Sequence, residues 1–284
     1  MADIKQLLVI GAGTMGHGIA QVAAGAGLDV TLNDVSEAQL EKGLAAVRAN
    51  LDKGIEKGKL TAEQKEQTLS HLEGATDLSA AAATADLVVE AVPESLELKQ
   101  KILRALDEAC PAHSILATNT SSLSIAGIAS ATNRPAQVVG MHFFNPVHLM
   151  ALLEIVRSDE TSDETVESAV GLARKMGKEP IVVADRPGFA SSRLGLVLGL
   201  EAMRMVEQGV ASPEDIDKAM TLGYRHPMGP LRLTDLVGLD VRLAIAEYLH
   251  RELKSEAFRP PEILRRLVGE GRLGKKSGRG FYEW

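Results

Sequence analysis

The chain has 284 residues, more than an average single domain, so two domains are expected. Its formal net charge of -7 and aromatic content of 3% argue against a nucleic-acid partner, because phosphates need a basic surface and bases need aromatic platforms. No apolar run approaches the roughly 20 residues that cross a bilayer, so no membrane partner is expected either.

Short β-type runs alternate with helical patterns in the N-terminal two-thirds, which predicts an α/β fold with a Rossmann-type, mainly parallel sheet. The expected strands are 5–10, 29–33, 87–92, 114–118, 137–141, 152–156 and 180–184. The expected helices lie near 14–26, 36–57, 62–70, 95–109 and 163–176. Because the 36–70 stretch is rich in Lys and Glu at helical spacing, it is expected to form a helical pair that projects from the sheet.

The first expected strand runs directly into the sequence GAGTMG, with Gly11, Gly13 and Gly16 at the turn into a helix. In a dinucleotide fingerprint the first glycine allows the tight turn, the second lets the backbone approach a pyrophosphate, and the third lets helix and strand pack closely. The helix N-terminus then offers free N–H groups to the phosphates. The motif predicts a dinucleotide site; the alternative is a glycine turn without a ligand.

Asp34 ends the second apolar run, directly after the expected strand 29–33, where an acid would accept hydrogen bonds from the adenosine ribose hydroxyls. Its carboxylate would repel a 2′-phosphate, and the next residues, Val35 and Ser36, offer no arginine to hold one. The predicted cofactor is therefore NAD rather than NADP. His17, inside the first helix, is expected to line the glycine turn without a catalytic role.

Two histidines, His142 and His148, lie in one short run after the expected strand 137–141. Open α/β sheets bind ligands at the carboxyl ends of their strands, and an imidazole is the usual group that takes the proton of an alcohol. Glu154 follows on the next expected strand, where a carboxylate would fix the imidazole tautomer. The alternative is that His142 is a structural histidine.

The pattern changes near residue 186, where Pro and Gly interrupt the chain and 3.6-residue periodicity takes over. Ser212 and Pro213 are expected to cap and begin a helix, and the prolines of Pro227-Met-Gly-Pro230 break the chain before another. The sequence therefore predicts an NAD-binding sheet domain over 1–186 and an all-helical C-terminal domain over 187–284.

Taken together, these motifs resemble the L-3-hydroxyacyl-CoA dehydrogenase family, which includes 3-hydroxybutyryl-CoA dehydrogenases. The resemblance runs from end to end, because each string occurs in the family's order and spacing. The strings are GAGTMG, Val89-Glu-Ala-Val-Pro-Glu94, Asn119-Thr-Ser-Ser-Leu123, His142-Phe-Phe-Asn-Pro146, Asp185-Arg-Pro-Gly-Phe189, Pro227-Met-Gly-Pro230, Asp235-Leu-Val-Gly-Leu-Asp240 and Gly278-Arg-Gly-Phe-Tyr282.

The resemblance implies roles for individual residues. His142 matches the general base, Glu154 its partner acid, and Ser121 a serine that contacts the substrate hydroxyl and the nicotinamide. The implied fold is a Rossmann domain and a helical domain that forms a homodimer interface, with the site in the cleft between the domains. The implied cofactor-binding residues are Gly11, Gly13, Thr14, Met15, Gly16, Asp34, Glu94, Lys99, Asn119, Ser121, Asn145 and Lys276.

One position departs from the family pattern. Ser192 stands where the family places an Asn that helps to hold the substrate oxygens, and a hydroxyl is shorter and offers one donor. This puts the rate or the choice of substrate in doubt, but not the class of reaction, and a bridging water could replace the missing reach. By family analogy Lys53, Lys57 and Lys59 are expected to hold the coenzyme A phosphates; the alternative is that they are solvent-facing lysines.

The predicted function is transfer of a hydride from C3 of an L-3-hydroxyacyl-CoA to NAD. Two alternatives stay open: a dehydrogenase of a non-thioester hydroxy compound such as gulonate or carnitine, and a dinucleotide-binding protein without catalysis. No metal is expected, because the sequence has no HExxH, no carboxylate loop and no clustered cysteines.

A cytoplasmic location is expected. The start, Met1-Ala-Asp3, carries an acid where a signal peptide needs a basic region, so no secretory segment is expected. The single cysteine, Cys110, rules out an intrachain disulfide and suits a reducing compartment. Because it lies at an expected helix end before Pro111, it is expected to be a structural thiol.

Overall fold

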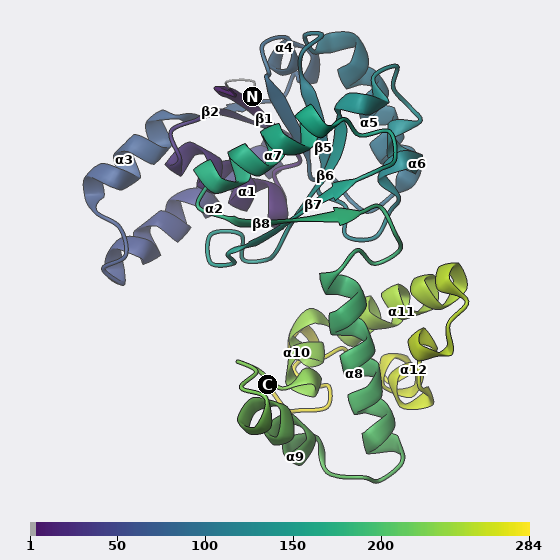
Figure 1. Ribbon diagram of the computed structural model, residues 1–284. Coiled ribbons are helices and arrows are strands. Elements are labelled where there is room, and N and C mark those ends of the chain that lie inside the picture. Colours follow the sequence, from purple (N-terminus) through teal and green to yellow (C-terminus); the bar gives the residue numbers. More distant parts are fainter. Residues whose placement is uncertain (1–3) are drawn as a thin grey trace. The chain divides into compact units, whose positions relative to one another are not determined.

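A computed structural model describes residues 4–284 and divides the chain into two compact units, which meet in sequence at Asp185 and Arg186. Met1 to Asp3, on which part of the expectation of no secretory segment rests, lie outside the described residues. The first unit holds a mostly parallel sheet with helices, and the second is built of helices (Figure 1). The predicted fold class is confirmed.

Within residues 4–284 one eight-stranded sheet has the order β3-β2-β1-β4-β5-β6-β7-β8. All neighbouring strands are parallel except β6 and β7, which pair antiparallel. The order reverses between β1 and β4, the point at which such sheets bind ligands. The strands are β1 Gln6–Ile10, β2 Asp29–Asn33, β3 Leu72–Ala75, β4 Leu87–Glu90, β5 Ile115–Thr118, β6 Val138–Phe143, β7 Leu152–Arg157 and β8 Glu179–Ala184.

Helices accompany the strands of the first unit. They are α1 Thr14–Gly25, α2 Glu37–Glu56, α3 Ala62–Ser70, α4 Leu78–Ala82, α5 Leu96–Ala109, α6 Ile125–Ala129, the short 3₁₀ turn η1 Pro135–Gln137, and α7 Asp163–Lys175. Ser36 caps α2 by accepting from Gln39 N–H, and Thr61 and Gln64 form a capping box at α3. Figure 1 shows α2 and α3 reaching out to one side of the sheet.

The core of the first unit is aliphatic. The central strands are buried on both faces, as in Leu8, Val9, Val88 and Val89 at 0% exposure, because helices cover a parallel sheet from both sides. Strand β3 was not predicted, since its sequence LEGA lacks the β-branched residues that mark a strand; it forms by pairing with β2 at the edge of the sheet.

The second unit packs its helices around a separate aliphatic core. Leu196, Leu200, Leu231, Leu249 and Leu264 lie at its centre with 0% exposure. Its elements are α8 Ser191–Glu207, α9 Pro213–Lys218, the π-helical turn η2 Ala219–Gly223, α10 Pro230–Val237, α11 Leu239–Leu253, the 3₁₀ turn η3 Glu256–Phe258, α12 Glu262–Gly269 and the 3₁₀ turn η4 Lys275–Ser277.

Two of the family strings meet inside the second unit. The carboxylate of Asp235 accepts hydrogen bonds from the backbone N–H groups of Phe281 and Tyr282 and from the Trp284 indole, each at 2.9 Å. A Cβ on Gly280 would lie 2.2 Å from this carboxylate, so only glycine fits there. The strings around 235 and 280 therefore have a structural function, which is to hold the C-terminal segment on α10.

Cys110 ends α5 and is buried, and burial raises the pKa of its thiol to about 11. The thiol stays protonated at neutral pH, which agrees with its expected structural role.

In the described part of the chain, no helix combines the length and the hydropathy that a bilayer crossing needs.

Candidate active site

The glycine turn joins β1 to α1. Gly11 has φ +94°, a conformation that favours glycine, and its N–H donates to Asn33 O at 2.8 Å. A Cβ on Gly16 would lie 1.6 Å from Gly11 O, so the close packing of helix and strand excludes every other residue there. A Cβ on Gly13, in contrast, would meet nothing within 4 Å. Gly13 therefore borders open space where a ligand can approach the backbone.

Asp34 follows β2 and lies against the glycine turn. Its Oδ2 accepts from Ala12 N–H at 2.9 Å and its Oδ1 from Ser36 N–H at 3.0 Å. These two bonds hold the carboxylate at the carboxyl end of the sheet and leave lone pairs on both oxygens for further donors. The geometry suits a carboxylate that accepts hydrogen bonds from ribose hydroxyls.

A pocket of about 660 Å³ opens beside this turn. Gly11, Gly13, Thr14, Met15 and Asp34 line it on the side of the glycine turn, and the rest of its lining is largely apolar. The apolar lining residues include Leu78, Ala91, Val92, Pro93, Leu98, Ile102 and Ala105. The volume and the apolar wall suit a planar base, and the side of the glycine turn suits a ribose and a pyrophosphate. Of the predicted positions, Gly11, Gly13, Thr14, Met15 and Asp34 are thus brought together in one pocket, whereas Gly16 packs the helix against the strand and does not line it.

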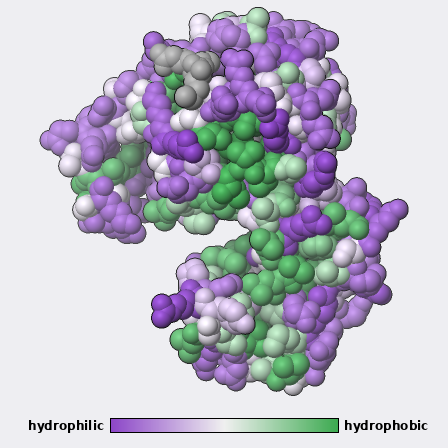
Figure 2. All heavy atoms as spheres, in the orientation of Figure 1, coloured by the Kyte–Doolittle hydropathy of each residue, from purple (hydrophilic) through white to green (hydrophobic). Residues whose placement is uncertain are grey.

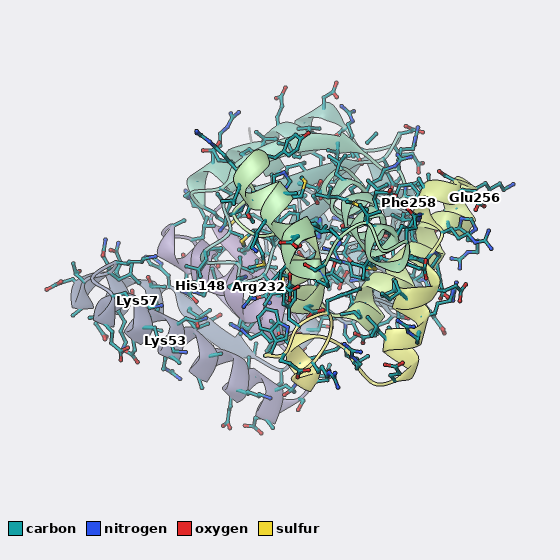
Figure 3. The ribbon with its side chains drawn as sticks, turned by 90° about the horizontal axis from the view of Figure 1, so that it is seen from below. Lys53, Lys57, His148, Arg232, Glu256 and Phe258 are labelled. Atoms are coloured by element: carbon teal, nitrogen blue, oxygen red, sulfur yellow. The ribbon has the colours of Figure 1, made fainter. Side chains whose placement is uncertain are left out.

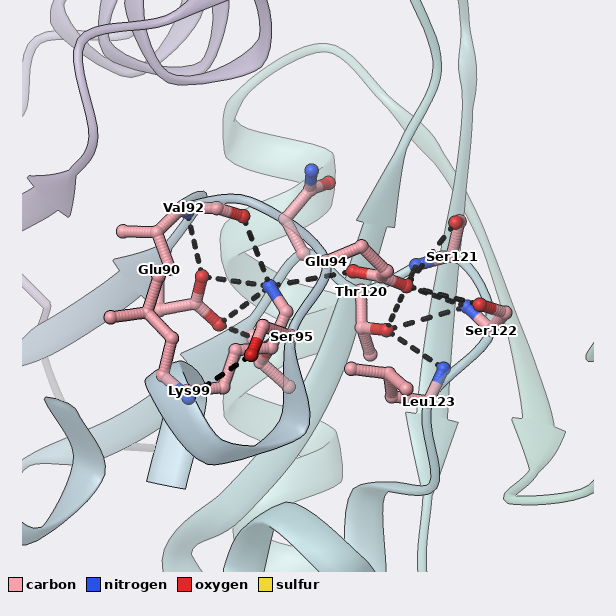
Figure 4. A network of polar contacts seen from close by, with 12 residues as sticks. Glu90, Val92, Glu94, Ser95, Lys99, Thr120, Ser121, Ser122 and Leu123 are labelled. Atoms are coloured by element: carbon pink, nitrogen blue, oxygen red, sulfur yellow. Dashed lines mark hydrogen bonds and ion pairs between the residues drawn. The ribbon is translucent and has the colours of Figure 1, made fainter. Parts of the chain in front are cut away.

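A buried ion pair joins β4 to α5 (Figure 4). The Lys99 Nζ contacts both carboxylate oxygens of Glu90, at 2.8 and 3.0 Å, and the carbonyl of Val92 at 3.3 Å, and both charged side chains have 0% exposure. Thr118 donates to the same carboxylate at 2.6 Å. Because the three ammonium protons face these acceptors, the arrangement favours an indirect role for Lys99. A direct contact of Lys99 with the dinucleotide stays a prediction.

Glu94 connects Lys99 to the loop of residues 120–123. Its Oε2 lies 3.5 Å from Lys99 Nζ, while its Oε1 accepts from the Thr120 hydroxyl at 2.6 Å and from the backbone N–H groups of Ser121 and Ser122 at 3.0 and 3.1 Å. Burial opposes ionisation, but the Thr120 bond, the Lys99 charge and the Ser121 and Ser122 bonds outweigh it, so the pKa of Glu94 lies below its usual range. Glu94 therefore orders the loop that presents Ser121.

His142 and Glu154 form a cross-strand pair at the carboxyl end of β6. The antiparallel register of β6 and β7 sets the two residues opposite each other, and His142 Nδ1 lies 2.8 Å from Glu154 Oε2. Glu154 is fully buried and His142 is 7% exposed. The sequence placed His142 just after the strand; the strand in fact continues to Phe143, so the imidazole is held by the ladder rather than by a loop.

The remaining predicted residues lie in different places. Asn119 follows β5 and its Oδ1 accepts from Phe143 N–H at 2.9 Å, which ties the ends of β5 and β6 together. Asn145 is exposed in the loop after β6. Ser192 on α8 and Lys276, which donates to Asp240 Oδ2 at 2.6 Å, belong to the second unit, and their part in the site stays a prediction.

The three lysines assigned to coenzyme A line a second pocket, of about 630 Å³, in the first unit. Lys53 lies in the last turn of α2 and Lys57 directly follows that helix (Figure 3), with Lys59 two residues further along the chain. His148 and Lys175 line the same pocket, and among all the lining residues none is acidic. The lysines therefore border a cationic hollow rather than a bare helix surface.

Glu90 and Thr120 are site residues that the sequence analysis missed. Glu90 ends a fully buried strand, and a carboxylate in such a run is the signal that could have predicted a buried partner for it. Thr120 lay inside a recognised string, but nothing in the string reveals that its hydroxyl binds a residue 26 positions earlier.

Comparison with known proteins assigns the family of each unit. Residues 6–186 match the family described as "3-hydroxyacyl-CoA dehydrogenase, NAD binding domain", and residues 188–284 match "3-hydroxyacyl-CoA dehydrogenase, C-terminal domain".

Individual relatives match over nearly the whole chain. A probable 3-hydroxybutyryl-CoA dehydrogenase of Bacillus subtilis is 48% identical over 99% of this chain and 98% of its own. The 3-hydroxybutyryl-CoA dehydrogenase of Bradyrhizobium diazoefficiens is 44% identical over 100% of this chain and 96% of its own. The crystal structure of (S)-3-hydroxybutyryl-CoA dehydrogenase from Ralstonia eutropha superposes with a TM-score of 0.95, at 43% identity and 99% coverage of both chains.

Proposed function

The chain belongs to the 3-hydroxyacyl-CoA dehydrogenase family and is an NAD-dependent enzyme of 3-hydroxyacyl-CoA oxidation, and we propose that it acts on the L-3-hydroxy ester of a short acyl chain such as 3-hydroxybutyryl-CoA. The observation that carries the proposed chemistry is the pair of His142 and Glu154 at the same sheet edge as the dinucleotide pocket. The strong match of both units to one family confirms the predicted enzyme class and the predicted cofactor, NAD.

His142 is the proposed general base. Glu154 engages Nδ1, and in this proposal Nε2 takes the proton from the substrate hydroxyl. The buried carboxylate then stabilises the imidazolium, and the strand ladder keeps the ring from turning away. When bound, NAD supplies the hydride acceptor, and the protein supplies position and charge.

Ser121 is the proposed donor to the substrate oxygen. Its backbone N–H donates to Glu94 at 3.0 Å, so the carboxylate fixes the position of the loop. Its hydroxyl also donates to Glu94, at 3.3 Å, and in this proposal turns from the carboxylate to donate its single proton to the substrate oxygen. Glu94, held in turn by Lys99, is in this proposal a positioning residue. Ser192 is proposed to contribute a further donor from α8, directly or through a water.

Asp34 is proposed to select NAD over NADP. Asp34→Ala removes the charge that repels a 2′-phosphate, so the ratio of kcat/KM for NAD to that for NADP is expected to fall by about 10- to 100-fold. Initial rates with each cofactor, at a fixed substrate concentration, measure this ratio. Glu41→Ala, an exposed acid further along α2, is the matched control and should leave the ratio as it is. An unchanged ratio in the Asp34 variant contradicts the assignment.

The pocket with Lys53, Lys57 and Lys59 is proposed to hold the phosphates of coenzyme A. The absence of acidic residues among its lining residues supports an anionic ligand, since phosphate oxygens pair well with ammonium groups. An acyl thioester that lacks the nucleotide of coenzyme A should therefore have a higher KM than the corresponding coenzyme A ester.

A spectrophotometric screen at about 340 nm tests the proposed reaction, because NADH absorbs there and NAD does not. Short, medium and dicarboxylic 3-hydroxyacyl-CoA esters are compared with free hydroxy acids, each with NAD or NADP. We expect turnover of the short esters with NAD. Turnover of free hydroxy acids alone would favour a non-thioester dehydrogenase, and reduction of the cofactor by none of them would favour a binding protein without catalysis.

We also propose that the chain forms a homodimer through the helical unit and works in the cytoplasm. Large apolar side chains are exposed on that unit, and Figure 2 shows hydrophobic surface over much of its visible face. The exposed large apolar side chains of that unit include Leu194, Val210, Leu222, Tyr224 and Val241. Light scattering should give the mass of two chains, whereas a monomer mass across a range of concentrations contradicts the dimer. The single cysteine supports the cytoplasmic location, which fractionation of cells tests.

A further inference from the structure

We propose that His148 binds a phosphate at the nucleotide end of the acyl-CoA and takes up a proton as it does so. The proposal rests on the proposed function and adds to it a residue whose charge depends on pH. The binding of the thioester then strengthens as pH falls, although the chemistry at His142 is a separate step.

The position of His148 supports the proposal. His148 lies in the loop after β6 and lines the pocket with Lys53 and Lys57 from the end of α2 (Figure 3), and Lys59 lines the same pocket. Lys175, at the end of α7, lines the pocket as well. The neutral polar lining residues are Gln21, Asn50, Gln64, Gln67 and Thr68. The pocket therefore offers donors from several elements, and none of its lining residues carries a negative charge.

Hydrogen bonds and packing hold the loop that carries His148 in place. The buried Lys178 ammonium donates to the carbonyls of Val147 and Met150, which flank His148. Val147 is packed closely against α1, because a Cβ on Gly18 would lie 2.9 Å from its side chain. The backbone at His148 is therefore fixed by these contacts. The His148 side chain is exposed, so a ligand can reach the imidazole.

The charges around the imidazole explain the link to protons. Burial, Lys178, His17, Lys57 and Lys59, in this order, lower the pKa of His148, which favours the neutral ring in the free protein. A phosphate placed among these cations reverses the local field and favours the imidazolium, since an opposite charge at a few ångströms raises the pKa of a histidine. The gain in affinity is thus present below the pKa of the bound state and is lost as pH rises through it.

The test compares KM for acetoacetyl-CoA, followed by NADH oxidation, between pH 6.5 and 8.5 in wild type, His148→Gln and His148→Lys. The ratio of variant to wild-type KM isolates position 148, because the titrations of His142 and of the phosphate are common to all three proteins. For His148→Gln we expect a ratio of about three to ten at the low end, falling towards one at the high end. For His148→Lys, which keeps a charge at every pH, we expect a ratio near one at pH 6.5 and below one at pH 8.5.

The ligand gives a second control. Acetoacetyl-pantetheine has no phosphate of the nucleotide, so the difference between His148→Gln and wild type should disappear with it. The ester of 3′-dephospho-coenzyme A tells the two phosphate sources apart, since a lost difference points to the 3′-phosphate and a retained one to the diphosphate. His113→Gln, a histidine paired with Asp86 elsewhere in the unit, is the matched control variant.

Proton uptake is measured directly by calorimetry of acetoacetyl-CoA binding in buffers of different ionisation enthalpy, where wild type should take up more protons than His148→Gln. A KM ratio that does not vary with pH, or that is the same with the pantetheine ester, overturns the proposal even if the enzyme is active. Lack of turnover with both esters instead contradicts the proposed function, so the two failures are distinguishable.

Discussion

His142→Gln is expected to lower kcat by about 10²-fold or more, because it removes the group that takes the hydroxyl proton. The imidazole lies 2.8 Å from Glu154, and glutamine fills a similar volume without a basic nitrogen. Initial rates of NADH formation from 3-hydroxybutyryl-CoA measure the loss. The binding of NAD should change little, since the dinucleotide pocket does not include His142.

A control variant must show that the fall in kcat comes from the loss of His142 and not from the loss of a histidine elsewhere. His71→Gln, which removes a histidine paired with Asp29 at 2.8 Å at the amino end of β2, should keep wild-type turnover. Glu154→Gln is expected to lower kcat as well, because an amide can donate to Nδ1 and favour the wrong tautomer. The double variant should lose little more than His142→Gln alone, as residues that act as a unit are not additive. A folded His142→Gln protein with normal turnover would refute the assignment.

Lys99→Met is expected to destabilise the protein by about 3–5 kcal/mol, because it leaves the Glu90 carboxylate buried without its partner. Urea unfolding, followed by circular dichroism, measures the change in the free energy of unfolding. Since Lys99 also contacts Glu94, turnover is expected to fall in the fraction that stays folded.

The matched control for this variant is Arg104→Met on the exposed side of the same helix, α5, which should change the free energy of unfolding by no more than about 0.5 kcal/mol. The double variant Glu90→Gln with Lys99→Met removes both charges and should recover part of the stability. Equal stability of Lys99→Met and Arg104→Met would show that the ion pair contributes nothing measurable.

Local patterns were enough to predict the dinucleotide turn and the order of sheet and helices. Gly11 and Gly16 are required by contacts inside one strand-turn-helix unit, so their spacing carries the information. Asp34 is predicted by the same kind of local signal, because it directly follows β2, the strand that pairs with β1. Strand β3 escaped prediction because its pairing with β2, and not its own composition, makes it a strand.

The contacts that give the site its chemistry were beyond sequence patterns alone. Lys99 was assigned to the cofactor, but the fold buries it against Glu90, a residue of the strand before its own helix. His148 stood beside His142 in the sequence without an assigned role, and the packing of α1, α2 and α7 around one pocket puts it among lysines.

Sequence periodicity and the family strings alone were sufficient for the fold class and the enzyme class, and they also singled out His142 and Glu154, whose catalytic roles stay proposals. That the two meet follows from the antiparallel register of β6 and β7, which depends on how the whole sheet assembles. The physical reason is that helix and turn signals arise between residues a few positions apart, whereas ion pairs, registers and pockets arise between segments that only the folded chain brings together.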